Sequence, residues 1–273
     1  MLTQRLNSLL FVPGNRPERF DKALAAGADA VIIDLEDAVA PADKDAARHA
    51  LAEWLDPTRP VMVRINAAET SWFAADLELL ERPGVAAVVL PKAEHPDDIG
   101  AASRAGGGLP VLPLIESAVG FENRLALAHA DGVARLVFGH IDFQADLNMH
   151  CAEDELLPFR VALVLVSRLA GIEAPIDGVC TALDDGELLR SDALRARRLG
   201  FGGKLCIHPR QVAVVNDCFT PEATDVDWAR RVLSANAASG GAAFAVDGKM
   251  VDKPLVMRAQ TLLAEATARR SRP

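Results

Sequence analysis

Apolar runs of strand length alternate with segments of helical spacing along most of this chain, and the alternation recurs eight times. The expected strands are Ser8–Pro13, Ala30–Asp37, Val61–Asn66, Ala86–Lys92, Leu109–Glu116, Val133–Asp142, Ala174–Cys180 and Gly203–His208. Eight strand-then-helix units spaced roughly 25–40 residues apart favour a closed parallel barrel over an open sheet. No Gly-x-Gly-x-x-Gly motif follows the first strand, which argues against a dinucleotide-binding fold. We therefore expect an α/β fold, a (β/α)8 TIM barrel.

The residues after the eighth unit are not needed to close a barrel. They predict a helix, a hairpin around the turn signal Asp247-Gly248, and a last helix, over Val226–Ala238, Phe244–Val251 and Pro254–Ala268. We expect residues 1–223 to form the catalytic barrel. Residues 224–273 are then a C-terminal helix–hairpin–helix extension of the same domain, acting as a lid over the barrel mouth or an arm to a neighbouring subunit.

The composition is that of a soluble globular enzyme. Of 273 residues, 50% are hydrophobic, and the formal net charge of -9 argues against a nucleic-acid partner, because phosphate binding needs a basic surface. No run of about 18 apolar residues predicts a membrane span, and no signal-peptide core is present. The cysteines Cys151, Cys180, Cys206 and Cys218 form no Cys-x-x-Cys pair. We expect a cytoplasmic protein with reduced thiols and a small-molecule substrate.

Polar residues gather where the expected strands end. In the third strand, Met62, Arg64 and Asn66 share one face by alternation, and the polar members fall at the carboxyl end. The same end of the other strands carries Glu36, Asp37, Lys92, Glu116, Asp142 and His208. Barrel enzymes place their chemistry at this end, so these groups are expected to converge on one rim.

Glu116 and Asp142 end two neighbouring apolar runs and form the candidate centre. A buried carboxylate is costly unless something positive meets it, and two carboxylates at matching strand ends can share one cation. Oxygen ligands without thiolates or a His pair suit Mg²⁺. Asp142 could equally cap the helix that follows it, whereas Ser117 is a better cap than Glu116.

The remaining rim residues also have structural interpretations. Glu36 and Asp37 could start a solvated loop or support the metal's waters. Arg64 could pair with a carboxylate only to hold the rim together. The sequence favours an exposed loop lysine at Lys92 and a structural hydrogen-bonding role for His208.

Seven short motifs spread along the chain are specific in combination. They are Leu-Phe-Val-Pro-Gly-Asn-Arg-Pro-Glu-Arg-Phe, Asp-Leu-Glu-Asp-Ala-Val, Val-Arg-Ile-Asn, Val-Leu-Pro-Lys-Ala-Glu, Leu-Ile-Glu-Ser, Lys-Leu-Cys-Ile-His-Pro and Gly-Lys-Met-Val-Asp-Lys-Pro. Together they resemble the citrate lyase beta-subunit-like family of the HpcH/HpaI-type aldolases and Mg²⁺-dependent acyl-CoA lyases. The resemblance implies a modified TIM barrel that cleaves or forms a C–C bond next to a thioester.

The resemblance also implies roles for rim residues. Glu116 and Asp142 match the family's ligands for one Mg²⁺ per subunit, and Glu116 lies in the substrate site. Arg64 matches the arginine that holds the substrate's carboxylate or keto oxygen and assists catalysis. Glu36 and Asp37 match acidic residues that order the metal's waters.

Outside the rim, the resemblance points to a tail residue and to a CoA site. Asp252 fits an aspartate that CoA-using members supply as acid/base from the tail of an adjacent subunit in a homotrimer or hexamer; alone, it reads as a helix N-cap. Arg16 and Arg19 lie where relatives bind CoA phosphates. His140 is a departure, because many relatives have an acidic residue there, and it could alter which acyl group fits.

The implied reaction is retro-Claisen cleavage of a 3-hydroxyacyl thioester, such as citryl-, malyl- or citramalyl-CoA. Its products are a 2-keto acid, such as oxaloacetate, glyoxylate or pyruvate, and an acyl thioester. Two alternatives stay open: a CoA-independent aldolase acting on free 2-keto acids, and a citrate lyase complex subunit acting on acyl carrier protein. The acyl group, the direction (lyase, synthase or thioesterase) and trimer versus hexamer stay open as well.

Overall fold

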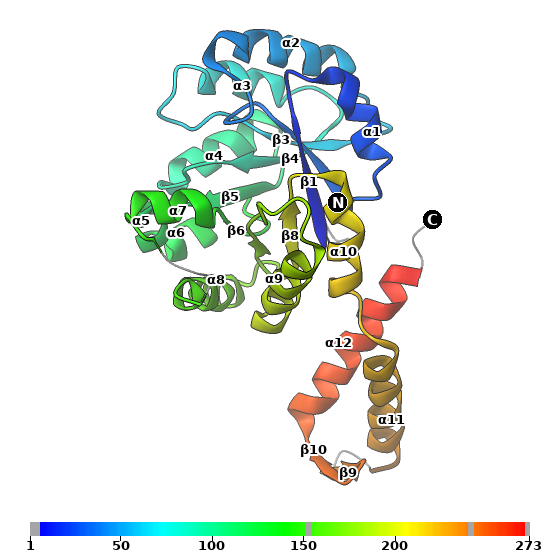
Figure 1. The fold of residues 1–273 in the computed structure, drawn as a ribbon. Helices are drawn as coiled ribbons and strands as arrows, with labels where there is room; N and C mark the ends of the chain where they lie inside the picture. Colours follow the sequence, from blue (N-terminus) through cyan, green and yellow to red (C-terminus); the bar gives the residue numbers. More distant parts are fainter. Residues whose placement is uncertain (1–5, 151–153, 240–242, 271–273) are drawn as a thin grey trace. The chain divides into compact units, whose positions relative to one another are not determined.

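The computed structural model describes residues 6–150, 154–239 and 243–270 of the chain. Eight parallel strands close into a barrel in chain order (Figure 1), so the predicted (β/α)8 fold is confirmed. The strands are β1 (Ser8–Pro13), β2 (Ala30–Asp34), β3 (Val61–Arg64), β4 (Val85–Leu90), β5 (Val111–Ile115), β6 (Val137–Phe138), β7 (Ile176–Asp177) and β8 (Gly203–Cys206). The barrel closes where Leu9 of β1 lies opposite Leu205 of β8.

Helices follow the strands and lie outside the barrel (Figure 1). They are η1 (Pro17–Arg19), α1 (Phe20–Leu24), η2 (Pro41–Asp43), α2 (Lys44–Trp54), α3 (Phe73–Leu79), α4 (Pro96–Ala105), α5 (Ala118–Glu122), α6 (Arg124–Ala128), α7 (His140–Asp146), α8 (Leu157–Ala170), α9 (Gly186–Leu199) and α10 (Pro209–Phe219). The predicted Ser117 cap is confirmed, because its Oγ accepts from the Gly120 N–H at 3.1 Å. None of the described helices combines the length and the apolar composition that a membrane span requires.

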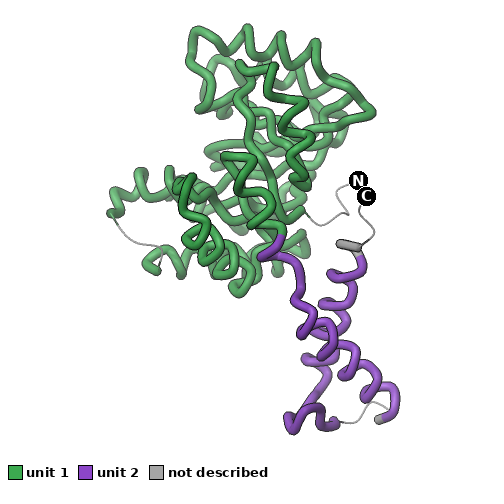
Figure 2. Tube along the Cα trace, turned by 45° about the vertical axis from the view of Figure 1, so that its right-hand side comes forward, with its two compact units in different colours: residues 1–216 green, residues 217–273 purple. Residues whose placement is uncertain are grey.

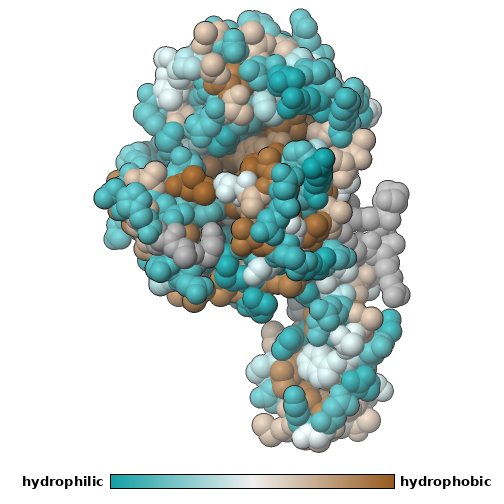
Figure 3. All heavy atoms as spheres, in the orientation of Figure 1, coloured by the Kyte–Doolittle hydropathy of each residue, from teal (hydrophilic) through white to brown (hydrophobic). Residues whose placement is uncertain are grey.

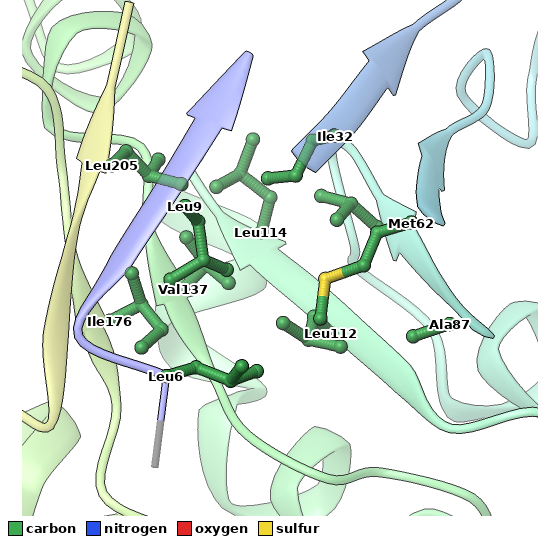
Figure 4. Close-up of a cluster of buried hydrophobic side chains, with 11 residues drawn as sticks. Leu6, Leu9, Ile32, Met62, Ala87, Leu112, Leu114, Val137, Ile176 and Leu205 are labelled. Atoms are coloured by element: carbon green, nitrogen blue, oxygen red, sulfur yellow. The ribbon is translucent and has the colours of Figure 1, made fainter. Parts of the chain in front are cut away.

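Strand alternation fills the barrel with apolar side chains from all eight strands (Figure 4). Ile32, Met62 and Leu114 are among these inward-facing core residues. Two positions further along the same strands, the inward face continues into Asp34, Arg64 and Glu116. The apolar core therefore supports a layer of charged side chains at the carboxyl ends of the strands.

Seven of the eight strands end one to four residues earlier than the sequence predicts, and two of these differences, in β2 and β6, relocate site residues. β2 ends at Asp34, because its carboxylate accepts from the Glu36 N–H two residues on, at 2.9 Å, and turns the chain. Glu36 and Asp37 thus lie beyond the strand. β6 has two residues, and Asp142 lies in the first turn of α7, whose N-cap position is Gly139. The expectations that Asp142 ends a strand or caps a helix are both wrong.

Residues 217–273 form a second compact unit, distinct from the unit of residues 1–216 (Figure 2). Its elements are α11 (Ala223–Ser239), β9 (Phe244–Val246), β10 (Lys249–Val251) and α12 (Lys253–Arg270). The predicted hairpin is confirmed: it turns at Asp247 and Gly248, whose φ angles are 52° and 74°. The unit has its own apolar core of Ala229, Val232, Val246, Val251, Val256, Ala259 and Leu262.

The described cysteines are buried, and the surface drawn in Figure 3 is mostly hydrophilic, as expected of a globular protein. Cys180 and Cys206 are buried thiols, as their apolar runs predict, and Cys218 is buried as well; none of the three forms a disulfide within the described chain. Cys151 lies outside the described residues. On the face of the barrel unit drawn in Figure 3, hydrophilic residues cover most of the surface and hydrophobic ones gather near a central hollow.

Candidate active site at the carboxyl ends of the strands

Arg64, the last residue of β3, lies at the centre of a buried ion cluster. Its Nε and Nη2 donate to Asp34 Oδ1 and Oδ2 at 2.7 and 2.6 Å, a bidentate pair. Its Nη1 lies 2.8 Å from Glu36 Oε2 and 3.7 Å from Asp37 Oδ2, and the guanidinium stands over the Phe11 ring. Burial opposes the charge, but Asp34 and Glu36 outweigh it and raise the pKa of Arg64. The cluster fixes this guanidinium in its charged form.

Asp34 and Lys44 support this cluster, although neither is among the residues predicted for the site. Asp34 holds Arg64 and also turns the chain toward Glu36. Lys44 donates from Nζ to the backbone oxygens of Leu35 and Glu36 at 2.8 and 2.7 Å, which fixes that turn. Burial lowers the pKa of Lys44. Strand alternation predicts that Asp34 faces inward like Ile32, so Asp34 could have been identified from the sequence. No sequence pattern points to Lys44.

Lys92 lies exposed in the turn after β4, as predicted, and it also connects Glu36 with Glu116. Its Nζ donates to Glu36 Oε1 at 3.2 Å, and its backbone N–H donates to Glu116 Oε1 at 2.8 Å. The Lys92 side chain is 43% exposed, and it lines a cavity. Burial raises the pKa of Glu36, while Arg64 works in the opposite direction. Glu36 is thus shared between two cations.

Glu116 follows β5 directly and is 4% exposed. Burial, followed by the negative charges of Glu36 and Asp142, raises its pKa to about 8, although the Lys92 N–H opposes the shift. Gly139 makes room for this carboxylate, because a Cβ there would overlap Glu116 Oε2 and lie 2.6 Å from Glu116 Cβ. A buried acid with a raised pKa beside other acids is a typical feature of a functional site.

Glu116 and Asp142 border two cavities at the barrel mouth. The larger, of about 670 Å³, is lined by Ala68, Glu69, Lys92, Glu94, His95, Asp98, Glu116, Ser117, Asp142, Ala145 and Asp146. The smaller, of about 60 Å³, is lined by Phe11, Arg64, Leu114, Glu116, Phe138, Gly139, His140, Ile141, Asp142, Val179 and Leu205. The two carboxylates therefore lie between a charged cavity and a smaller one with an apolar floor and a guanidinium.

The pair can supply oxygen ligands to a divalent ion. Among the described residues, no group of three or more His, Cys, Asp or Glu side chains is placed to hold a metal. Two carboxylates suit Mg²⁺, which keeps waters and substrate oxygens in its octahedral shell. A cation would also offset the negative charge that raises the pKa of Glu116. The residues present therefore fit Mg²⁺.

The other predicted residues lie in varied settings. Arg16 and Arg19 are exposed after β1, and both contact Glu18, at 2.6 and 3.8 Å. Asp252 belongs to the second unit, where it is exposed and directly precedes α12. The structure therefore brings together Glu36, Asp37, Arg64, Glu116 and Asp142 at the mouth.

Two histidines at the mouth differ in their surroundings. His208 is a structural hydrogen-bonder, as predicted: its Nδ1 accepts from the Arg210 N–H at 3.1 Å. His140 is buried and fills the space beside Gly178, where a Cβ would overlap the imidazole. His140 also borders the smaller cavity.

Comparisons with known proteins agree with the fold. Residues 7–209 match the HpcH/HpaI aldolase/citrate lyase family. A citrate lyase subunit beta-like protein of Deinococcus radiodurans is 39% identical over 282 residues, covering 95% of this chain and 96% of that protein. A (3S)-malyl-CoA thioesterase of Cereibacter sphaeroides is 32% identical and covers 96% of this chain and 94% of its own length.

A solved structure extends the comparison to three dimensions. The protein CitE of Mycobacterium tuberculosis, in complex with magnesium, acetoacetate and coenzyme A, superposes with a TM-score of 0.86 at 38% identity, covering 96% of this chain and 98% of its own. Sequence motifs, barrel and relatives thus agree over nearly the full length. The chain therefore belongs to the HpcH/HpaI aldolase/citrate lyase family, a family of carbon–carbon lyases.

Proposed function

We propose that this protein is a Mg²⁺-dependent lyase that cleaves a 3-hydroxyacyl-CoA thioester into a 2-keto acid and an acyl thioester. The buried Glu116 carboxyl, beside Asp142 and facing the Arg64 cluster, carries the proposal. The similarity to a protein solved with magnesium, acetoacetate and coenzyme A supports it. Buried cysteines that form no disulfide within the described chain support a cytoplasmic location.

Glu116 and Asp142 would hold one Mg²⁺ per subunit. When bound, the ion would supply Lewis acidity toward the substrate's carboxylate and hydroxyl oxygens. Glu116 would also contact the substrate, and Glu36 and Asp37 would order water at the ion through hydrogen bonds. The volume beside this pair can take a small keto acid together with the thioester end of a longer molecule.

Arg64 would stabilise the negative charge that develops as the C–C bond breaks. Its two bonds to Asp34 and its contact with Glu36 fix the guanidinium while leaving one N–H on each of Nη1 and Nη2 for a substrate oxygen. A donor held in place before the reaction needs no reorganisation as charge develops.

Asp252 would protonate the acyl thioester enolate, or remove that proton in the condensation direction. We propose that residues 1–223 are the catalytic barrel and that the tail, residues 224–273, reaches a neighbouring subunit of a homotrimer or hexamer. A separate apolar core in this tail supports the proposal that it is an arm with a fold of its own.

Arg16 and Arg19 are proposed to bind CoA phosphates, because both are exposed after β1.

Subunit mixing tests this arrangement. Asp252→Ala and Arg64→Ala chains are each expected to be inactive. A mixed oligomer should regain partial activity, since some sites then combine an intact barrel with an intact tail. Absence of any recovery, with mixing verified by native mass spectrometry, would contradict sharing between subunits.

The substrate is tested with a panel of citryl-, malyl- and citramalyl-CoA, read by mass spectrometry with Mg²⁺ or with EDTA. We expect a keto acid and an acyl-CoA to form only with Mg²⁺. Activity on free hydroxy acids alone would indicate the CoA-independent aldolase. Activity restricted to an acyl carrier protein thioester would indicate a subunit of a lyase complex.

A further inference from the structure

Lys92 has a backbone conformation that its residue type rarely adopts. Among the described residues, three non-glycine residues have positive φ: Lys92 (45°), Asn148 (52°) and Asp247 (52°). Asn and Asp tolerate this region because their short side chains bond locally, whereas a lysine has no such compensation. Strain of this kind persists only where the surroundings impose it, and it clusters at functional sites.

The turn around Lys92 is anchored on both sides. Leu90 ends β4, and the Ala93 N–H donates to the Leu114 oxygen of β5 at 3.3 Å. Between these anchors, the left-handed turn directs the Lys92 N–H to Glu116 Oε1, at 2.8 Å. The other oxygen of Glu116 lies against Gly139, where no Cβ would fit. The orientation of the Glu116 carboxylate is thus set by a backbone amide on one side and a glycine on the other.

We propose that Lys92 is a positioning residue for the metal-binding carboxylate, and that its left-handed backbone, more than its ammonium, performs this role. The proposal rests on the proposed Mg²⁺ site. The ammonium has a separate partner, Glu36, at 3.2 Å, in the Arg64 cluster. One residue therefore connects the metal-binding side of the mouth with the guanidinium side through two different nitrogens.

The two roles can be separated by substitution, because backbone and side chain respond differently. Lys92→Gly, Lys92→Ala and Lys92→Val all remove the ammonium and keep the N–H. Glycine adopts positive φ freely, alanine less readily, and β-branched valine least. The backbone role predicts a graded response across this series, whereas the ammonium role predicts three equal responses.

Mn²⁺ serves as the probe, because its binding to the purified protein is read by electron paramagnetic resonance without turnover. We expect Lys92→Gly to bind Mn²⁺ within about threefold of the parent protein and Lys92→Val to bind it roughly 10-fold or more weakly, the scale of losses when a ligand's supporting contact is removed. Lys92→Ala should fall between them. The kcat of all three variants, measured at saturating Mn²⁺, should fall together, because all three lose the contact with Glu36.

The control places the same strain elsewhere. Asp247→Val puts valine at a positive φ in the β9–β10 turn, and its Mn²⁺ affinity should equal that of the parent. Circular dichroism shows which variants are folded. If Lys92→Val is not folded, the Mn²⁺ affinities of Lys92→Gly and Lys92→Ala are compared instead. Equal Mn²⁺ affinity across the folded variants, or a Gly variant as weak as Val, would overturn the proposal. A parent protein that binds no Mn²⁺ would overturn the proposed metal site as well.

Discussion

In two buried ion clusters of the barrel unit, the pKa values of Asp177 and Glu116 are shifted in opposite directions. Between β7, β8 and α8, Asp177 accepts from Arg160 Nε at 2.9 Å and from Lys204 Nζ at 3.0 Å. Burial alone would raise its pKa, but the two cations hold it at about 2. At the mouth, burial and neighbouring acids raise the pKa of Glu116 to about 8.

Charge balance explains the difference. Asp177 and Lys204 alternate with the core residues Ile176 and Leu205, so they face outward, where one acid meets two cations. At the mouth, acids outnumber cations, and the side chains border cavities. The single buried acid of the outward cluster is satisfied by cations of the chain itself. The mouth has acids in excess beside open cavities, where an added cation can bind. A buried ion cluster is therefore a candidate cation site when its acids outnumber its cations and it borders a cavity.

The largest expected effect is on activity at the mouth. Glu116→Gln and Asp142→Asn should each lower kcat/KM by roughly 10³-fold or more, since a metal contributes several kcal/mol to transition-state stabilisation. The fold should remain intact, because Gln keeps the shape of Glu116. Steady-state kinetics with Mg²⁺ measures the effect, and near-parental activity of either variant in EDTA would contradict the metal assignment.

The outward cluster should respond in stability instead. Asp177→Ala leaves the buried cations of Arg160 and Lys204 without this carboxylate and should destabilise the protein by about 3–5 kcal/mol. Urea denaturation followed by circular dichroism measures the change. Below the denaturation midpoint, kcat per folded molecule should equal that of the parent; a selective loss of kcat would show that the two clusters are functionally coupled.

The opposite pKa shifts predict opposite effects of pH on stability. Because folding raises the pKa of Glu116 from 4.5 to about 8, its contribution to stability is present below pH 4.5 and is lost as pH rises through 8. Folding lowers the pKa of Asp177 from 3.8 to about 2, so its contribution is present above pH 3.8 and is lost as pH falls through 2. Each amounts to a few kcal/mol.

Melting curves from pH 2 to 9 in EDTA check this difference. Glu116→Gln should flatten the decline above pH 4.5, and Asp177→Asn the decline below pH 3.8. Mg²⁺ should oppose the decline at high pH by binding the deprotonated Glu116. An unchanged alkaline limb in Glu116→Gln would argue that its carboxyl is not the source of the shift.

The smallest expected effect comes from crowding the Glu116 carboxylate. Gly139→Ala places a Cβ against Glu116 Oε2 and Cβ and should weaken Mn²⁺ binding by roughly 10–100-fold. Gly186→Ala is the matched control, because a Cβ there meets nothing within 4 Å. Calorimetric titration compares the two; equal affinities would mean that Glu116 can relocate without losing the ion.

Part of the site was predictable by strand alternation. Alternation along β3 predicted that Arg64 lies at the carboxyl end of this strand on the inward face, and the structure confirms that location. Asp34 follows from the same rule, but the run Asp34–Asp37 contains three acids, and alternation does not tell which one bonds to arginine. Lys92 could not be predicted, because its role depends on a backbone angle and on partners 24 and 56 residues away.

The sequence by itself determined the barrel and the end of the barrel at which charged residues gather. Both follow from the hydrophobic periodicity of short segments, which can be read from residues that are close together in the chain. Only the tertiary structure decided that Asp34 bonds to Arg64 across 30 residues, that Gly139 makes room for Glu116, and that Asp142 belongs to the first turn of α7. These contacts depend on barrel closure, which brings together strand ends that are distant along the chain.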